Sequence, residues 1–128
     1  MKKKYLIVIA DYYKDVSKGL LKSAKELFPK SSSIKVINVP GVFEIPITIA
    51  KNIKKYDAFM ALGCVIKGQT PHFDFISKST TDAIMNLSIE SKKPIGNGII
   101  TCLNMRQAIL RQKKGREAAQ AVISVLSQ

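Results

Sequence analysis

The chain has 128 residues, 46% of them hydrophobic, with 21 basic and 9 acidic side chains that give a formal charge of +12. This length and apolar content predict one compact domain over residues 1–128, and no second domain is expected. The positive charge favours anionic partners such as phosphorylated metabolites, nucleic acid or an acidic membrane surface, but it does not choose among them.

The sequence shows no export or membrane segment of the usual length. An apolar run from Tyr5 follows a basic start, but it ends at Asp11, short of the roughly 7 to 15 residues of a secretory signal. No stretch approaches the roughly 18 apolar residues of a membrane span. Cys64 and Cys102 form no CxxC or Cys/His cluster, so neither a disulfide framework nor a zinc site is expected. We therefore expect a cytoplasmic protein with reduced cysteines, no metal and no membrane partner.

Short runs rich in Ile and Val predict strands at Tyr5–Ala10, Ile34–Val39, Ala58–Ile66 and Pro94–Thr101. Because these runs lack two-residue alternation, each strand is expected to be buried on both faces. Between the strands, residues recur at helical spacing. They are Val16, Leu20, Ala24 and Leu27, then Ile45, Ile49 and Ile53, then Phe75, Ser79, Ala83 and Leu87.

After the fourth predicted strand, Asn104 is expected to cap a helix that runs through Arg111. The segment Lys113–Arg116 then breaks this helix before a last one, whose apolar positions are Ala118, Ala121, Val122 and Val125. The alternation of strands and helices predicts a four-stranded parallel sheet with helices on both faces. This is the three-layer sandwich of the α/β class.

Ligands of open α/β sheets bind outside the carboxyl ends of the strands, so the loops at those ends are candidate site segments. Four loops meet this condition: Asp11–Lys14, Pro40–Glu44, Lys67–Phe73 and Cys102–Asn104.

The third of these loops predicts an anion site. Gly68 permits a close backbone approach, Thr70 offers a hydroxyl, and a helix that begins near Pro71 presents free N–H groups. An ordinary turn and helix start would use the same residues. The stretch from Gly63 to Thr70 also nearly matches a nucleotide-binding P-loop. Gln69 stands where that motif has the lysine that reaches the terminal phosphates, so nucleotide hydrolysis is not predicted.

His72 and Arg111 could complete a reactive site around this loop. His72 is the single histidine, and a helix start favours its neutral form, which can accept a proton. A lone histidine also often serves as a capping or surface residue. Arg111 could reach over the carboxyl edge of the sheet toward the third loop and fork two hydrogen bonds to a phosphate. Without an anion site, Arg111 would be an ordinary solvated arginine.

Aromatic side chains stand at two other strand ends. Tyr12 and Phe43 could hold a flat heteroaromatic ring between them, and Glu44 could accept protons from hydroxyl or amide groups. The alternative places Phe43 in the core and leaves Glu44 to stabilise a helix dipole. The basic clusters Met1–Lys4 and Lys113–Arg116 adjoin no RNA-binding motif or aromatic stripe. They are interpreted as solvated surface, with no nucleic-acid partner.

Three segments together resemble the lumazine synthase family: VPGVFEIP at Val39–Pro46, ALGCVIKGQTPHFDFI at Ala61–Ile76 and PIGNGIITCLN at Pro94–Asn104. The similarity runs from Leu6 nearly to the end of the chain, in order and with matching spacing. It implies a flavodoxin-like fold and a cofactor-free condensation of 5-amino-6-ribitylaminouracil with 3,4-dihydroxy-2-butanone 4-phosphate. The products would be 6,7-dimethyl-8-ribityllumazine, phosphate and water.

The resemblance also implies roles for individual residues. The pyrimidine and its ribityl chain would contact Tyr12, Val42, Phe43, Glu44, Cys64, Val65 and Ile66. Gln69, Thr70 and Arg111 would bind the phosphate, with Gly68 and Lys114 as further candidates, and His72 would shuttle protons. The active sites would lie between the subunits of a homopentamer, with the segment around Asn97 supplied by a neighbour.

The sequence departs from the family pattern at several positions. Tyr12 replaces the usual Phe or Trp, Lys67 the usual Arg and Leu103 the usual Glu, and the connection Gln112–Gly115 is shorter than in members that build hollow shells. Two alternatives stay open at this point. One is a pentameric riboflavin synthase, which would not need a phosphate clamp. The other is a basic binding module that has kept the fold and lost the chemistry, an interpretation that Leu103 supports.

Overall fold

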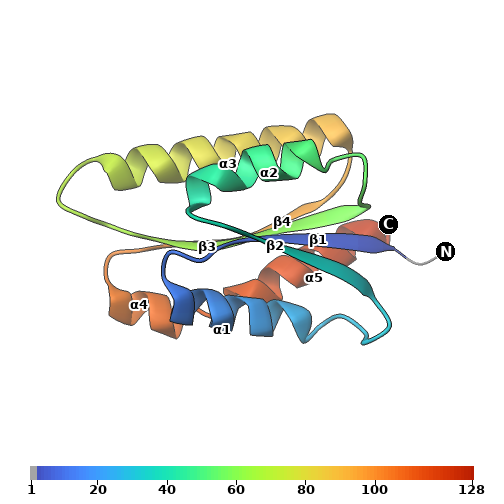
Figure 1. Ribbon diagram of the computed structural model, residues 1–128, viewed down its shortest axis with the longest axis horizontal. Helices are drawn as coiled ribbons and strands as arrows, with labels where there is room; N and C mark the ends of the chain where they lie inside the picture. Colours follow the sequence, from blue (N-terminus) through green and yellow to red (C-terminus); the bar gives the residue numbers. More distant parts are fainter. Residues whose placement is uncertain (1–2) are drawn as a thin grey trace.

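The computed structural model describes residues 3–128, and Figure 1 shows a central sheet between two layers of helices. The sheet has four parallel strands in the order β2-β1-β3-β4. The strands are β1 (Lys4–Ala10), β2 (Ser33–Val39), β3 (Ala58–Ile66) and β4 (Ile95–Cys102). The predicted α/β sandwich with flavodoxin-like connectivity is therefore confirmed.

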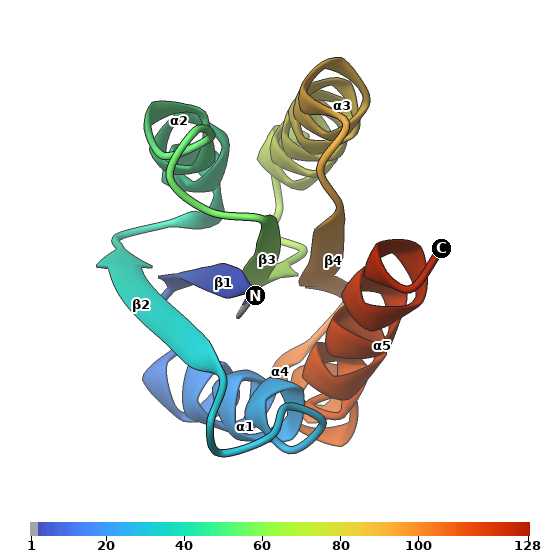
Figure 2. The same ribbon diagram turned by 90° about the vertical axis from the view of Figure 1, so that its right-hand side faces the viewer.

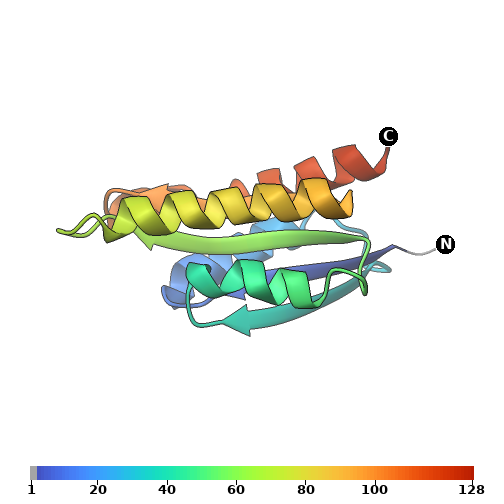
Figure 3. The same ribbon diagram turned by 90° about the horizontal axis from the view of Figure 1, so that it is seen from above.

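The helices divide between the two faces of the sheet (Figure 2). One face carries the short 3-10 helix η1 (Val42–Glu44), α2 (Ile45–Lys51) and α3 (His72–Ser91). The other face carries α1 (Lys14–Lys25), α4 (Met105–Leu110) and α5 (Lys114–Leu126). Figure 3 shows α2 and α3 running lengthwise along the strands. Among residues 3–128, no helix combines the length and the apolar character needed to cross a membrane.

Burial of the strands depends on their place in the sheet. Leu6–Ala10 in β1 and Ala58–Cys64 in β3 are buried on both faces, as predicted for runs without alternation. The edge strands β2 and β4 contain exposed residues along their length, so the prediction of burial on both faces is wrong for them. An edge strand has a neighbour on one side only, and the helix layers do not fully cover the margin of the sheet.

Two apolar clusters fill the spaces between the layers. Successive residues of one strand point to opposite faces, so β1 contributes Ile7 to the cluster under α1 and α5 and Leu6 to the cluster under α2 and α3. Strand β3 divides in the same way, with Met60 in the first cluster and Phe59 in the second. The two central strands therefore pack against both helix layers, and this packing fixes the position of their carboxyl ends.

The helices differ from the predicted spans in two respects. Leu27 and Ile53 lie beyond the ends of α1 and α2, in the loops that follow. In α3, Thr80 and Ile84 are buried, whereas the predicted apolar face that begins at Phe75 is partly exposed. The side of α3 that is buried is set by the position of the helix over β3 and β4, which its own periodicity does not specify.

The connection between α4 and α5 corrects another boundary. Asn104 caps α4 as predicted, since its Oδ1 accepts a hydrogen bond from a backbone N–H one turn later at 2.9 Å. A break between the two helices exists, but it spans residues 111–113 instead of the predicted Lys113–Arg116, because α5 already begins at Lys114. Gly115 is buried inside this first turn, where a Cβ atom would collide with the carbonyl oxygen of Leu20 in α1. The glycine thus permits a close approach of two helices instead of ending one.

The strand order creates a crevice at one end of the molecule. From β1 the chain passes to β2 on one side, and it later enters β3 on the other side of β1. The loops after β1 and β3 therefore diverge, and such a divergence is where open α/β sheets bind ligands. All four candidate loops lie at this carboxyl end, on the left in Figure 1.

Candidate active site

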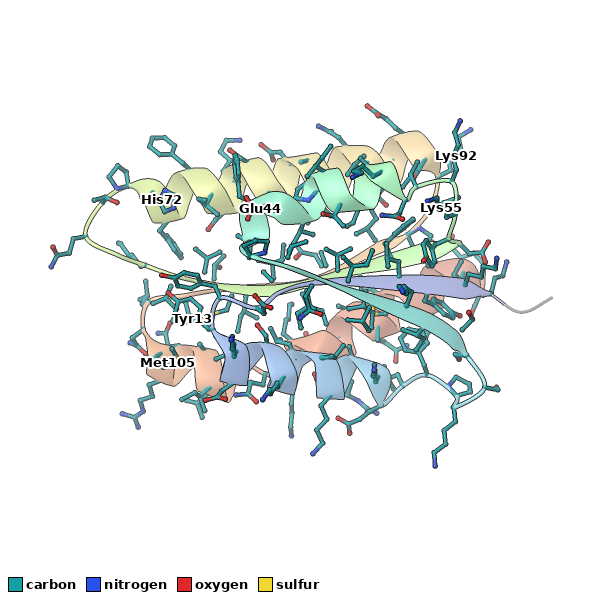
Figure 4. The ribbon with its side chains drawn as sticks, in the orientation of Figure 1. Tyr13, Glu44, Lys55, His72, Lys92 and Met105 are labelled. Atoms are coloured by element: carbon teal, nitrogen blue, oxygen red, sulfur yellow. The ribbon has the colours of Figure 1, made fainter. Side chains whose placement is uncertain are left out.

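A pocket of about 790 Å³ opens at the carboxyl ends of β1, β2 and β3. In Figure 4, Tyr13, Glu44 and His72 gather at this end, whereas Lys55 and Lys92 lie at the opposite end of the sheet. The lining combines residues from the loops after β1 and β2 with the end of β3 and the first turns of α3. It consists of Tyr12, Tyr13, Gly41, Val42, Phe43, Glu44, Cys64, Val65, Ile66, His72, Phe75, Ile76 and Ser79.

The loop after β1 supplies two aromatic rings. Tyr12 is 75% exposed, and its ring centroid lies 4.9 Å from that of Tyr13 at an interplanar angle of 82°. Tyr13 is half-buried and lines the same pocket. The sequence prediction selected Tyr12 and missed Tyr13, although a second aromatic residue directly after a buried strand was a signal that could have found it. The pocket thus has an aromatic wall of two rings set edge to face.

The loop after β2 places an exposed aromatic ring and a carboxylate at the pocket. Phe43 is 60% exposed, so the alternative that it belongs to the core is wrong. Val42 is the buried member of this turn and packs in the cluster under α2 and α3. Glu44 occupies the N-cap position of α2, yet its side chain makes no capping hydrogen bond there. Its carboxylate is therefore available to a ligand in the pocket.

The end of β3 forms an uncharged wall of the pocket. Burial, and then the neighbouring Cys102, raise the pKa of the Cys64 thiol to about 12. The nucleophile in cysteine chemistry is the thiolate, and Cys64 is protonated throughout the physiological pH range. Together with Val65 and Ile66, it offers an apolar edge and backbone polar groups, and it does not act as a nucleophile.

We expect Cys64 to resist alkylation by iodoacetamide at pH 8 in the folded protein and to react readily in urea. A pKa near 12 instead of 9.0 lowers its thiolate population about a thousandfold. Peptide mapping by mass spectrometry would follow Cys64 separately from Cys102. Because the folded pKa is raised, the stability that the neutral thiol contributes is present below pH 9.0 and is lost as the pH rises toward 12. Equal labelling rates in the folded and unfolded protein would contradict this environment for Cys64.

His72 is the first residue of α3 and lies at the rim of the pocket. Its backbone N–H donates to Thr70 Oγ1 at 3.4 Å, which turns this hydroxyl toward the helix start. Gly68 and Gln69 are exposed in the loop before it and do not line the pocket. The residues predicted to bind phosphate in this loop are therefore exposed next to His72, outside the pocket.

Arg111 lies in a second hollow of about 450 Å³. Its Nη1 donates to the carbonyl oxygen of Thr101 at 3.1 Å, and Lys114 lines the same hollow with its Nζ 3.6 Å from Glu117 Oε1. Within one chain, Arg111 and Lys114 do not join the pocket of His72. The remaining lining residues are Ile99, Ile100, Leu110 and Lys113.

Asn97 also lies apart from the pocket. It is an exposed residue of the edge strand β4, and its Oδ1 accepts a hydrogen bond from the backbone N–H of Ile99 at 3.0 Å. The structure thus separates the predicted site residues into three groups. One group lines the pocket with His72, a second is the exposed loop Gly68–Thr70 before α3, and the third, with Arg111, Lys114 and Asn97, lies along β4 and the start of α5.

Two departures from the family pattern, Lys67 and Leu103, lie next to each other. The backbone N–H of Lys67 donates to the carbonyl oxygen of Cys102 at 2.8 Å, directly before Leu103. Leu103 is 58% exposed, and its backbone N–H donates to Gln107 Oε1 at 2.7 Å. Within residues 3–128, neither of the side-chain ion pairs includes Lys67. Gln107 thus steadies this loop without a carboxylate at position 103.

Comparison with known proteins shows the family to which the chain belongs. A sequence model of the family described as 6,7-dimethyl-8-ribityllumazine synthase matches residues 2–128. A protein of that name from Nitrobacter hamburgensis is 41% identical over 94% of this chain and 82% of its own length. A relative from Rhodopseudomonas palustris is 42% identical with the same coverage. One from Corynebacterium kroppenstedtii is 36% identical over 91% of this chain and 79% of its own length. The chain belongs to the 6,7-dimethyl-8-ribityllumazine synthase family.

Proposed function

We propose that this protein condenses 5-amino-6-ribitylaminouracil with 3,4-dihydroxy-2-butanone 4-phosphate to give 6,7-dimethyl-8-ribityllumazine, phosphate and water. This is the penultimate step of riboflavin biosynthesis. As a member of its family, the protein is an enzyme of the transferase class. The observation that carries the proposal is the pocket at the carboxyl ends of the strands, where aromatic rings, a carboxylate and the single histidine converge. We place the reaction in the cytoplasm, where the two free cysteines stay reduced.

The pocket suits a flat ring with a polyhydroxyl chain. Tyr12 and Phe43 offer aromatic faces for the pyrimidine, and the backbone from Cys64 to Ile66 can pair with its polar edge. Glu44 can accept hydrogen bonds from the ribityl hydroxyls, because no capping bond occupies its carboxylate. Val42 closes the turn behind them. This arrangement holds the amine of the first substrate in a fixed position.

His72 is placed to move protons during the condensation. The amine must attack a carbonyl group and form an imine with loss of water, phosphate must leave, and the ring must close with loss of a second water. Each step transfers a proton, and an imidazole at the pocket rim can accept or donate it. No cofactor takes part in these steps. Much of the rate enhancement should come from holding two substrates together, because a bimolecular encounter becomes effectively intramolecular.

We expect His72→Ala to lower kcat about 10²-fold and to leave measurable turnover. The residual rate reflects substrate positioning, which the pocket walls supply. The His72 side chain is exposed, so the substitution should leave the urea unfolding midpoint nearly unchanged. Steady-state kinetics would measure the effect. Complete loss of turnover in a normally folded variant would contradict a role limited to proton transfer.

The second substrate would be bound between two chains. Gln69 and Thr70 face outward beside His72, and the Arg111 hollow opens elsewhere on the same chain. If one copy presents its Arg111 and Lys114 to the loop of the next copy, the phosphate meets a fork of donors, a hydroxyl and an amide together. A closed ring of five copies would repeat this contact, with Asn97 entering the neighbour's pocket. We therefore propose a homopentamer with its active sites at the subunit interfaces.

The direct test mixes purified protein with both substrates and follows lumazine fluorescence and phosphate release. The proposal predicts that both signals rise together, in equal amounts and well above the spontaneous reaction. Incubation with lumazine alone is the control, because riboflavin formed there would indicate a riboflavin synthase. Phosphate and lumazine that stay at the spontaneous rate would overturn the proposed function.

A further inference from the structure

The aromatic wall of the pocket includes the ring of Tyr12, which is mostly exposed to solvent. Tyr12 is 75% exposed and stands in the turn between β1 and α1. Within residues 3–128, its aromatic neighbour is Tyr13, at a centroid distance of 4.9 Å and an interplanar angle of 82°. An exposed tyrosine ring in a turn samples several rotamers unless a neighbour restricts it. The orientation of Tyr12 therefore depends on what holds Tyr13.

Tyr13 is fixed from two directions. Its half-buried ring packs against the apolar cluster under α1 and α5. Its carbonyl oxygen accepts a hydrogen bond from the backbone N–H of Ser17 at 2.9 Å, and Ser17 Oγ donates to the carbonyl oxygen of Ala10 at 2.6 Å. These bonds close the turn from the end of β1 to the first turn of α1. Tyr13 is thus a rigid element at the edge of the pocket.

The chemistry of Tyr13 suits a structural part of the wall. Burial, then Tyr12 and then Cys64, raise the pKa of its phenol above the ordinary value of 10.0. The hydroxyl therefore remains neutral at physiological pH and adds no charge to the wall. A T-shaped contact between two aromatic rings adds stabilisation beyond the area that it buries, and this favours one orientation of an exposed ring.

We propose that Tyr13 is a positioning residue: it holds the Tyr12 ring edge to face, so that Tyr12 presents one fixed aromatic face to the pyrimidine substrate. The inference rests on the proposed function for the identity of that substrate. It assigns to Tyr13 a role in binding the pyrimidine through Tyr12, distinct from proton transfer at His72 and from phosphate binding at Arg111.

The test compares Tyr13→Ala with Tyr13→Phe and with a control outside the site. Tyr56→Ala is the matched control, because Tyr56 is also half-buried and packs on Phe59 with a centroid distance of 6.1 Å and an angle of 69°. For each variant, KM for the pyrimidine, kcat and the urea midpoint are measured. We expect Tyr13→Ala to raise this KM roughly three- to tenfold and to leave kcat within about twofold. Tyr13→Phe keeps an aromatic ring, so its KM for the pyrimidine should stay close to the wild-type value. Tyr56→Ala should lower the urea midpoint and leave KM and kcat unchanged.

A second measurement does not require activity. In the nuclear magnetic resonance spectrum, the ring protons of Tyr12 should carry ring-current shifts from Tyr13, which Tyr13→Ala abolishes and Tyr13→Phe retains. Unchanged Tyr12 shifts in Tyr13→Ala would overturn the positioning role, whether or not the enzyme makes lumazine. An unchanged KM in Tyr13→Ala, or a KM in Tyr13→Phe as high as in Tyr13→Ala, would also overturn it. Absence of lumazine formation by the wild-type protein would instead refute the proposed function.

Discussion

Arg111→Ala should raise KM for 3,4-dihydroxy-2-butanone 4-phosphate by about 10²- to 10³-fold. Two charge-assisted hydrogen bonds to a phosphate are each worth about 1.5–3 kcal/mol, and removing both forfeits most of that sum. The folded chain should tolerate the change, because Arg111 is exposed and its Nη1 contact is with the Thr101 carbonyl oxygen at 3.1 Å. Arg111→Lys keeps the charge but loses the fork, so its KM should fall between those of the wild type and Arg111→Ala.

Controls separate phosphate binding from a general loss of charge. Arg106→Ala removes an exposed arginine from α4, outside the Arg111 hollow, and should leave both KM values unchanged. The KM for the pyrimidine substrate should change little in Arg111→Ala, since its proposed contacts lie in the other pocket. Initial rates with each substrate varied in turn would measure both constants. An equal increase in KM for both substrates in Arg111→Ala would argue against a role of Arg111 in phosphate binding.

Mixed oligomers of two impaired variants should recover activity when the phosphorylated substrate is kept far below the KM expected for Arg111→Ala. The double variant Glu44→Ala/His72→Ala damages the part of the active site that lies in the pocket. Arg111→Ala damages the part that lies along β4 and the start of α5. If each active site joins one half from each of two neighbouring chains, random 1:1 mixing leaves about a quarter of the sites with both halves intact. Activity should then be about a quarter of that of the wild type, well above either variant alone.

The mixing experiment requires that the subunits exchange. Unfolding the two variants together in urea and refolding them, or expressing both in one cell with different tags, would produce mixed rings. Refolding each variant alone provides the background, and light scattering reports the oligomeric mass. A site complete within one chain would yield only the average of the two parent activities. That average, measured in a confirmed mixed oligomer, would refute the placement of the sites between subunits.

Local sequence patterns predicted the elements well because burial in the centre of a sheet leaves a local signature. The unbroken apolar runs of β1 and β3 identify strands covered on both faces. Asn104 identified the start of α4, because its short side chain accepts a hydrogen bond from the helix itself. The segments at Val39–Pro46, Ala61–Ile76 and Pro94–Asn104 indicated the family, which the comparison over residues 2–128 shows.

Local patterns failed where distant parts of the chain decide the outcome. Gly115 belongs to the segment predicted to break the helix, yet it lies inside α5, where the carbonyl oxygen of Leu20 in α1 leaves no room for a Cβ atom. Phe75 belongs to an apolar periodicity of α3, but the position of the helix over β3 and β4 turns Thr80 and Ile84 inward instead. Exposure of the edge strands likewise depends on the strand order.

From the sequence alone, the four strand segments and the cap of α4 could be predicted, because these depend on neighbouring residues and on runs of apolar side chains. Tertiary structure alone decided which loops meet. It brought the Tyr12–Tyr13 loop together with Phe43 and Glu44 at one pocket and placed Arg111 in a separate hollow from His72. The reason is physical: the strand order β2-β1-β3-β4 sets the distances between loops, and parallel pairing joins segments far apart in the chain.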